Sequence, residues 1–383
     1  MAEYVVARPE LGIGVIGAGY MGKAYSMALN AVNATFALSN NARLEMLATM
    51  PHEDAEERAS AWGYRRATRD WRELVNDPAV QVVAVCTPTF MHAEMAMAAI
   101  QAGKHVICEK PIALDAATAR QMADAAEAAG VVNLVGYNYV RNPATQLARQ
   151  MIAAGELGDI ISFRGTHIED FLANPQAEIS WRQQKDYSSR AGALGDLASH
   201  IVNLAHFLCG PVTRVVGDRQ IVHAMRPDAS GQMLPVENDD QTSFLMRFAN
   251  GAMGSVEASR VALGRKMGLS FEVTGTRGSL YFTQERMAEL QFYSASDDPA
   301  RSGFRTILIG PQHPDYGSFC LGDGHGIGFN DMVTIEMRDL LEAIGRGRPM
   351  WSDFRNACHT AEVVEAVLRS CDSGLWQEVP APR

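Results

Sequence analysis

Gly17-Ala18-Gly19-Tyr20-Met21-Gly22 follows the apolar run Leu11–Ile16 and precedes a segment with helical spacing. A strand, a tight glycine turn and a helix in this order can hold a pyrophosphate on the backbone N–H groups of the helix N-terminus. The glycine pattern alone is weak, but here the strand before it and the helix after it are both predicted. We therefore expect dinucleotide binding at Gly17, Gly19, Tyr20, Met21 and Gly22. A turn that only lets helix and strand pack closely is the alternative.

Length and composition limit the classes of protein to which the chain can belong. Its 383 residues exceed one ordinary domain, and its 47% hydrophobic content can support large cores. The net charge of -10 disfavours nucleic acid as a partner. The sequence has no apolar stretch of membrane-spanning length, no secretory signal pattern, and six scattered cysteines without metal-ligand spacing. We expect a cytoplasmic protein with free thiols, no membrane partner and no metal site.

The first half of the chain alternates short apolar runs with helical patterns. The expected strands are Leu11–Ile16, Arg43–Thr49, Gln81–Cys86, His105–Cys108 and Val131–Gly136. The expected helices include Glu53–Trp62, Met91–Ala102 and Asp115–Ala129, and Asp70 and Asp115 are candidate N-caps. This alternation predicts a Rossmann domain over residues 1–138, an α/β fold with a doubly wound parallel sheet.

Polar residues follow three of these predicted strands. Thr87-Pro88, Glu109-Lys110-Pro111 and Tyr137-Asn138 each stand where a strand is expected to end. Because ligands of such sheets bind at the carboxyl ends of the strands, these residues should line one cleft. Lys110 would then place a cation, and a potential proton-transfer group, beside the bound dinucleotide.

After about residue 140 the pattern changes to consecutive strands with short turns, among them the hairpin turn Asn250-Gly251. We expect residues 139–383 to form an α+β domain on an open, largely antiparallel sheet. The expected strands are Ile160–Ile168, Val215–His223, Thr242–Phe248, Ala252–Ala258, Leu269–Thr274, Gly278–Phe282, Glu289–Tyr293 and Arg305–Ile309. The expected helices are Pro143–Ala154, residues 192–209, Asp331–Gly345 and Asn356–Ser370, and the stretch Pro311–Gly328 is expected to be a loop.

One helical segment of the second domain carries ionisable side chains. Asp196, His200 and Asn203 have the spacing i, i+4, i+7, which would place them on one face, apart from a leucine-rich apolar stripe. A carboxylate one turn away can fix the orientation of a histidine, so that His200 could accept the proton of an alcohol. The alternative is that Asp196 caps the helix and His200 is a structural, hydrogen-bonded histidine.

The fingerprint Gly17–Gly22, the tripeptide Glu109-Lys110-Pro111 and the segment Gly192…Asp196…His200 together resemble the Gfo/Idh/MocA family of NAD(P)-dependent oxidoreductases. The resemblance runs over essentially the whole chain, in the same domain order. Members that oxidise anhydrosugars are the most similar, and inositol dehydrogenases come next. The segments that carry this finer likeness are Phe163-Arg164-Gly165-Thr166, Ser180-Trp181-Arg182 and Gly268–Gly278.

The resemblance implies hydride transfer between a secondary hydroxyl of a sugar, anhydrosugar or inositol and a nicotinamide cofactor, giving a keto sugar. It implies that His200 is the general base, that Asp196 orients it, and that Lys110 donates a hydrogen bond to the reacting oxygen. Cofactor contacts are expected at Thr87, Pro88, His92, Glu109, Lys110, Asn138, Trp181 and Arg182. Substrate contacts are expected at Lys110, Tyr137, Glu169, Asp196 and His200. For His92, Tyr137 and Glu169, a purely local role is the alternative.

The cofactor preference depends on the residue that ends the second strand. An acid is usual there, because it binds the ribose hydroxyls of NAD. The comparable residue here is Thr49, which would not repel the 2′-phosphate of NADP. However, the following stretch Met50–Asp54 offers two acids and no arginine. We expect NAD, with NADP as a second possible cofactor.

Three other functions stay open. They are a glycoside hydrolase that oxidises its substrate only transiently, a keto-sugar reductase working in the reverse direction, and a non-catalytic sensor. The hydrolase offshoot of this family typically lacks the lysine, and a sensor would be expected to lose Lys110 or His200. The presence of both residues therefore favours the dehydrogenase.

The second domain also predicts self-association. A sheet with helices on one side only leaves an apolar face that must be covered. Face-to-face packing would cover it, so we expect a homodimer or homotetramer.

Overall fold

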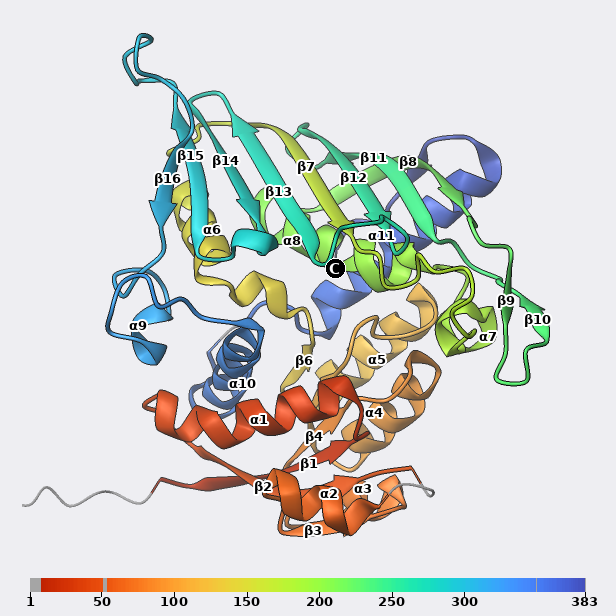
Figure 1. Ribbon diagram of the computed structural model, residues 1–383. Coiled ribbons are helices and arrows are strands. Elements are labelled where there is room, and N and C mark those ends of the chain that lie inside the picture. The colour runs from red at the N-terminus through yellow and green to blue at the C-terminus, as the bar shows by residue number, and fades with distance from the viewer. Residues whose placement is uncertain (1–7, 51–53, 349, 383) are drawn as a thin grey trace, which may run out of the picture.

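The computed structural model contains two large sheets, one lying above the other, with helices between and beside them (Figure 1). The structure describes residues 8–50, 54–348 and 350–382. The expected helix start at Glu53 lies outside these residues. Within them, no helix is long and apolar enough to cross a membrane.

The first sheet is parallel throughout, and its strands have the order β3-β2-β1-β4-β5-β6. Its strands are β1 (Glu10–Ile16), β2 (Asn41–Ala48), β3 (Arg66–Thr68), β4 (Val82–Val85), β5 (His105–Cys108) and β6 (Asn133–Val135). The helices that connect them are α1 (Tyr20–Thr35), α2 (Ala55–Trp62), α3 (Trp71–Asn76), α4 (His92–Gln101) and α5 (Ala116–Ala129). The predicted doubly wound sheet is confirmed. The chain reverses its direction of winding between β1 and β4, and ligands of such sheets bind at that point.

Local sequence explains most of these elements. All four residues of β4 are buried, as expected for an apolar strand that is covered on both faces. The side chains of Asp70 and Asp115 accept hydrogen bonds from the first-turn N–H groups of α3 and α5, which confirms both predicted N-caps. The short strand β3 was not expected, because three residues are too few to produce a periodic pattern.

The second sheet is mixed. Its strand order is β16-β15-β14-β13-β7-β12-β11-β8-β17, and all neighbours are antiparallel except β7 and β12. The strands are β7 (Ile160–Ile168), β8 (Val212–Gln220), β11 (Gln241–Phe248), β12 (Met253–Ser259), β13 (Gly268–Gly275), β14 (Gly278–Thr283), β15 (Glu289–Ser294), β16 (Arg305–Leu308) and β17 (Gln377–Glu378). A separate hairpin joins β9 (Met225–Pro227) to β10 (Met233–Pro235). The prediction of a largely antiparallel second sheet is therefore confirmed.

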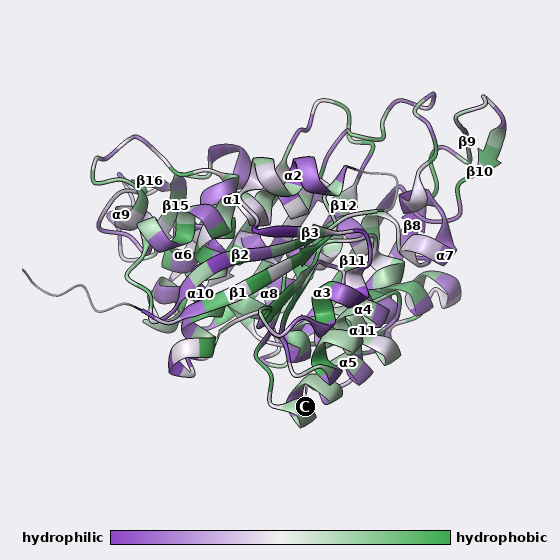
Figure 2. Ribbon diagram, turned by 90° about the horizontal axis from the view of Figure 1, so that it is seen from below, coloured by the Kyte–Doolittle hydropathy of each residue, from purple (hydrophilic) through white to green (hydrophobic). Residues whose placement is uncertain are grey.

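Helices of the second half cover one face of this sheet and enclose the largest apolar core (Figure 1). Those that contribute residues to this core are α6 (Pro143–Ala153), the π-helical turn η4 (Leu194–Ala198), α8 (Ser199–Cys209), α9 (Tyr316–Phe319) and α11 (Phe354–Ser373). The other helices of this half are α7 (Lys185–Ser188) and α10 (Phe329–Arg346). Short 3₁₀ turns are η1 (Thr89–Met91), η2 (Asn138–Arg141), η3 (Trp181–Gln183) and η5 (Gln284–Arg286). The stretch expected as a loop thus contains α9. Figure 2 shows hydrophobic strands at the centre of the view and hydrophilic residues towards the periphery.

Late segments of the chain return to the first domain. Helix α10 packs against α1, where Val333, Met337 and Leu340 share a core with Leu29 and Val32 (Figure 1). The first turn of α11 joins the core on the other side of the parallel sheet. The domain boundary at residues 138 and 139 stays a prediction, and this return was not visible in the sequence.

The outer face of the second sheet is more polar than we expected. One row across it contains Leu245, Ser255, Arg164, Glu272 and Tyr281 on five neighbouring strands. Arg164 and Glu272 form an ion pair, while Leu245 and Tyr281 are exposed. The outer face is therefore mixed rather than uniformly apolar, because polar residues alternate with exposed apolar side chains on these strands.

Candidate active site

A cavity of about 1050 Å³ lies between the two sheets, at the carboxyl ends of the parallel strands. Its walls come from the turns after β1, β4, β5 and β6, from the turn η4, and from residues 171–191, which we call the covering segment. Most of the site residues predicted from the sequence line this cavity. They are Gly19, Tyr20, Met21, Thr87, Pro88, Glu109, Lys110, Asn138, Glu169, Trp181, Arg182, Asp196 and His200.

The glycines of the fingerprint shape a turn that fits a dinucleotide. Gly17 has a φ of 105°, and a Cβ atom there would lie 2.7 Å from the carbonyl oxygen of Cys86. A Cβ atom on Gly22 would lie 2.0 Å from the carbonyl oxygen of Gly17. At Gly19, by contrast, no described atom lies within 4 Å of the Cβ position, and no side chain there caps α1. The helix N-terminus therefore presents open backbone N–H groups, as a bound diphosphate requires.

Five of the predicted site residues do not line the described cavity: Gly17, Gly22, Thr49, His92 and Tyr137. His92 is buried, and its ring nitrogens lie 2.9 Å from the carbonyl oxygen of Pro111 and 2.8 Å from that of Thr87. It therefore ties the turn after β4 to the turn after β5. Tyr137 is also buried, and its ring packs edge-on against His200 with centroids 5.5 Å apart. Both positions correspond to the local alternative considered for these residues.

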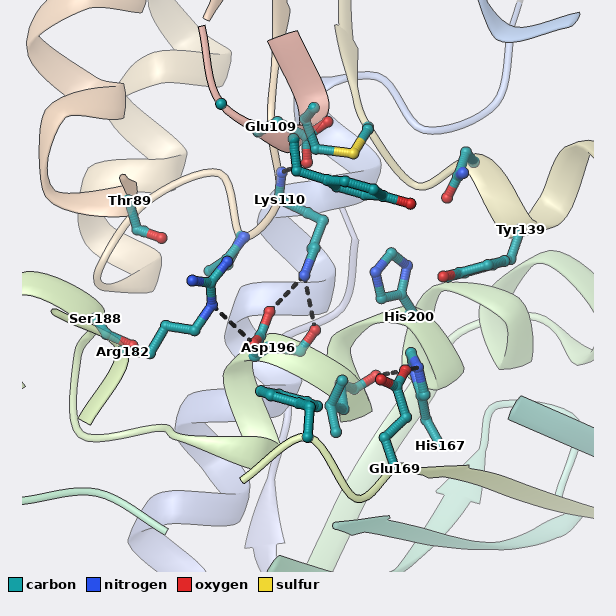
Figure 3. A pocket seen from close by; sticks show the side chains of 18 of the residues that line it. Thr89, Glu109, Lys110, Tyr139, His167, Glu169, Arg182, Ser188, Asp196 and His200 are labelled. Carbon is teal, nitrogen blue, oxygen red and sulfur yellow. Dashed lines mark hydrogen bonds and ion pairs between the residues drawn. The ribbon is translucent and has the colours of Figure 1, made fainter. Parts of the chain in front are cut away.

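Lys110 and Asp196 meet across the cavity. The Nζ atom of Lys110 donates hydrogen bonds to Oδ1 of Asp196 at 2.5 Å and to its backbone carbonyl oxygen at 2.9 Å (Figure 3). Nε of Arg182 lies 3.6 Å from Oδ2 of the same carboxylate. Burial alone would raise the pKa of Asp196, but the charges of Lys110 and Arg182 hold that pKa well below its usual value of 3.8. Asp196 is therefore ionised and is paired with two cations.

His200 faces aromatic rings rather than the carboxylate we expected. Its ring centroid lies 4.7 Å from that of Tyr139 and 5.5 Å from that of His167 (Figure 3). No hydrogen bond joins it to Asp196 in the described part of the chain, so the predicted orienting contact is wrong. Burial and the charges of Lys110 and His167 lower the pKa of His200 well below 6.5. The imidazole is therefore neutral near pH 7 and can accept a proton.

The π-helical turn η4 explains this difference. A π turn closes i→i+5 hydrogen bonds, so side chains four residues apart no longer line up as they do in an α-helix. Asp196 lies in η4, and His200 lies just after it in α8. Asn203, which we expected on the same face, instead accepts hydrogen bonds from Trp351 and Ser352 away from the cavity.

Sequence reasoning missed part of the wall beside His200. Nε2 of His167 lies 2.9 Å from Oε1 of Glu169, and Nδ1 lies 3.1 Å from the carbonyl oxygen of Leu197 in η4. Tyr139 also lines the cavity. The i, i+2 spacing of His167 and Glu169 at the end of a predicted strand could have identified the pair, since it places both on one side of the sheet.

The position expected to select the cofactor lies beside the fingerprint. Thr49 directly follows β2 and is buried, and Ala48 accepts a hydrogen bond from the backbone N–H of Gly17. Thr49 does not line the described cavity. Arg58 of α2 reaches this edge, where its Nη1 atom donates to the carbonyl oxygen of Ala18 at 2.7 Å. The arginine that is missing from Met50–Asp54 therefore comes from further along α2, which brings a guanidinium group back to the fingerprint.

A glycine turn at the switch point of a parallel sheet, with proton-transfer groups close by, defines a dinucleotide-dependent oxidoreductase. The family model described as "Oxidoreductase family, NAD-binding Rossmann fold" matches residues 11–137. The model of the GFO/IDH/MocA C-terminal domain matches residues 145–281. The chain belongs to the GFO/IDH/MocA family of NAD-binding oxidoreductases.

Named relatives span nearly the whole chain. Levoglucosan dehydrogenase of Pseudarthrobacter phenanthrenivorans is 39% identical, over 97% of this chain and 98% of its own. The scyllo-inositol 2-dehydrogenase (NAD(+)) of Bacillus subtilis is 27% identical, over 86% of each chain. A solved structure of levoglucosan dehydrogenase in complex with NADH and levoglucosan is similar with a TM-score of 0.94, at 40% identity, over 97% of this chain and 99% of that one.

Proposed function

We propose that the protein oxidises a secondary hydroxyl group of a neutral sugar to a ketone with NAD, and that an anhydrosugar such as levoglucosan is the foremost substrate. An inositol is the second candidate. The observation that carries the proposal is the meeting of Lys110, Asp196 and His200 in one cavity beside the fingerprint. The likeness to levoglucosan dehydrogenase over 97% of the chain supports the anhydrosugar.

The side chains divide the reaction between them. Bound nicotinamide supplies the hydride acceptor. His200, neutral before reaction, accepts the hydroxyl proton, and Lys110 donates a hydrogen bond to the oxygen that becomes the carbonyl. Asp196 holds the ammonium group of Lys110 in the cavity by a hydrogen bond, a role that takes the place of the expected orientation of His200. In the reverse direction His200 returns the proton.

The cavity walls favour an uncharged polyol. Glu169 places a carboxylate on the cavity, where it can accept hydrogen bonds from hydroxyl groups and would repel a phosphate. Tyr20, Tyr139 and Phe329 line another side and offer apolar ring faces to the C–H groups of a sugar. The proposed substrate is therefore neutral, with hydroxyl groups on one side and C–H groups on the other.

The test is nicotinamide reduction by the purified protein. The panel contains levoglucosan, myo-inositol, scyllo-inositol, glucose and glucose 6-phosphate, each with NAD and with NADP, and Lys110→Ala as the control. Lysine-dependent NADH formation with a neutral sugar is expected. Activity confined to the phosphorylated sugar would contradict the proposal. Cleavage of an aryl glycoside without net NADH formation would favour the hydrolase, and reduction of the keto sugar alone would favour the reductase.

We also infer that the protein is cytoplasmic and self-associates as a homodimer or homotetramer. The thiols of all six cysteines are free, which suits a reducing compartment. The exposed side chains Leu245, Met253 and Tyr281 on the outer face of the second sheet support an interface there. Light scattering checks this, and Leu245→Lys should shift the mass towards the monomer. A monomeric wild-type protein would contradict the inference.

A further inference from the structure

The segment Asn238-Asp239-Asp240 lies between β10 and β11, outside the cavity, yet it contacts two of the cavity's walls. The three residues are 0%, 1% and 0% exposed. Burial of charged groups is costly unless they are fully hydrogen-bonded, so the partners of these side chains indicate what the segment holds in place.

Asp239 binds the start of the turn that carries Asp196 and leads into the helix of His200. Its Oδ1 atom accepts from the backbone N–H of Gly192, and its Oδ2 atom from that of Leu194, each at 2.8 Å. Its backbone carbonyl oxygen accepts from the N–H of Ala193 at 2.9 Å. The first N–H groups of a helix lack partners within it, and no side chain of η4's own N-cap supplies one. Asp239 therefore serves as a remote cap for η4.

The backbones approach so closely at this cap that position 192 has no room for a side chain. A Cβ atom on Gly192 would lie 2.1 Å from the carbonyl oxygen of Asp239. Thr242 donates a further hydrogen bond to Oδ2 of Asp239 at 2.8 Å, which fixes the carboxylate from the side of β11. Since Asp196 lies two residues beyond Leu194, a displacement of the cap would move Asp196 and, through η4, His200.

Asn238 holds a different wall. Its Nδ2 atom donates to the backbone carbonyl oxygens of Arg182 at 2.8 Å and of Ser189 at 3.3 Å, both in the covering segment. Its Oδ1 atom accepts from Arg260, which is fully buried and forms an ion pair with Asp240 at 3.0 Å. The buried ion pair of Arg260 and Asp240 thus fixes the Oδ1 side of Asn238. The Nδ2 side of Asn238 binds the backbone of Arg182, whose side chain faces Asp196.

We propose that Asp239 is a positioning residue for Asp196 and His200, and that Asn238 is a positioning residue for Arg182. These two adjacent residues thereby align η4, which leads into His200, with the part of the covering segment that carries Arg182. The inference rests on the proposed function, since it takes His200 as the proton acceptor, Asp196 as the partner of Lys110, and Arg182 as a cofactor contact. Beyond that function, it states that two residues outside the cavity, Asn238 and Asp239, set the positions of these side chains.

The experiment distinguishes Asp239 from Asn238 because the first should affect kcat and the second the Kd of NADH. Asp239→Asn keeps the shape of the side chain but replaces one carboxylate oxygen by an NH₂ group. This group cannot accept a hydrogen bond from the backbone N–H of Gly192 or Leu194. The kcat of Asp239→Asn should fall about 10- to 100-fold, the effect of a displaced reacting group, while the Kd of NADH stays within about twofold. Asn238→Ala should instead raise the Kd of NADH about three- to tenfold, with kcat at saturating NAD within about threefold of wild type.

Two controls exclude a general loss of stability. Asp228→Asn changes an aspartate that also accepts backbone N–H groups, those of Ser230 and Gln232, but in an exposed turn of the β9–β10 hairpin, and it should change neither parameter. Val273→Ala weakens the core of the same sheet and should lower Tm without lowering kcat at a temperature where the variant is folded.

The outcomes distinguish this inference from the proposed function. If wild type forms no NADH with any sugar, the proposed function fails, and NADH binding by Asn238→Ala still tests the second half of the inference. If wild type is active and Asp239→Asn keeps its kcat, the positioning role of Asp239 is wrong. Asp239→Asn and Asn238→Ala could instead change kcat and the Kd of NADH in the same proportion. If Val273→Ala has the same effect at an equal loss of Tm, residues 238–240 have only a structural role.

Discussion

The ammonium group of Lys110 lies 2.5 Å from Oδ1 of Asp196 and 2.9 Å from the backbone carbonyl oxygen of the same residue. Lys110 follows β5 of the parallel sheet, whereas Asp196 belongs to η4 beneath the second sheet. The pair therefore joins the two domains across the cavity. It also sets the electrostatics of the site, because the charge of Lys110 acts both on Asp196 and on His200.

Replacement of Lys110 by methionine should reduce activity and shift its pH dependence. Loss of a hydrogen-bond donor to the reacting oxygen should lower kcat about 10²- to 10³-fold. The charge of Lys110 lowers the pKa of His200, so its removal should raise that pKa. Oxidation needs neutral His200, whose fraction falls as the pH drops through its pKa. The acid limb of kcat should therefore lie below pH 6.5 in wild type and move to higher pH in the variant.

A pH series of kcat at saturating NAD and sugar checks both expectations. Lys104→Met is the matched control, because its ammonium group binds the carbonyl oxygens of Asp77 and Val80, away from the cavity. An acid limb that stays in place in Lys110→Met would show that Lys110 does not act on the residue that titrates.

Gly19→Ala should leave the fold intact and weaken cofactor binding. The backbone φ of Gly19 is −81°, which alanine adopts freely, and no described atom lies within 4 Å of the new Cβ atom. That space is where a diphosphate would approach the start of α1. We expect an unchanged Tm and a rise of about tenfold or more in the Kd of NADH, measured by fluorescence titration.

Gly17→Ala provides the contrast. Its φ of 105° and the carbonyl oxygen of Cys86 at 2.7 Å make any side chain strained, so Tm should fall as well. If Gly19→Ala binds NADH as tightly as wild type does, the diphosphate of the cofactor does not lie at Gly19.

Local patterns in the sequence were sufficient for part of this site. The fingerprint and the Glu109-Lys110-Pro111 turn each follow an apolar strand, and a parallel sheet brings such strand ends together whatever else the chain does. The relative orientation of Asp196 and His200 was not predictable in this way. It depends on the π turn, which Asp239 caps from more than 40 residues further along the chain.

The same limit applies to Arg58 and to α10. Helical periodicity predicts α2 but does not indicate that its guanidinium reaches the carbonyl oxygen of Ala18. It predicts α10 but does not show which sheet the helix covers, because an apolar stripe fits any apolar partner. Tertiary packing decides both.

Arg58→Ala should change the choice between the two cofactors. The 2′-phosphate of NADP binds near the end of the second strand in this fold, and Arg58 lies at that edge through its hydrogen bond to Ala18. Wild type should prefer NAD, and the variant should raise the KM of NADP about tenfold more than that of NAD, since it loses a charge-assisted contact. Arg69→Ala, which removes an exposed ion pair with Glu56, is the control. Equal effects on the two KM values would exclude Arg58 from recognition of the phosphate.

Glu336 on α10 should make stability depend on pH. It is fully buried, and neither carboxylate oxygen has a hydrogen-bond partner among the described residues. Burial, opposed by the charge of Arg141 and reinforced by those of Glu109 and Asp339, raises the pKa of Glu336 well above 4.5. Above pH 4.5 the unfolded chain releases this proton while the folded protein retains it. The contribution of Glu336 to the free energy of unfolding therefore decreases as the pH rises, by about 1.4 kcal/mol per pH unit until the folded-state pKa is reached.

Glu336→Gln removes this titration and keeps the shape of the side chain. Urea unfolding of both proteins between about pH 5 and pH 8 should show the variant gaining stability over wild type as the pH rises. Glu342→Gln alters a carboxylate on the same helix that binds Ser39 and Arg346, and it should lower stability instead, because its partners lose a charge-assisted bond. Parallel curves for wild type and Glu336→Gln would mean that the carboxyl group ionises in the folded protein as readily as in the unfolded chain. In that case a buried partner, such as an ordered water molecule, would have to compensate the charge.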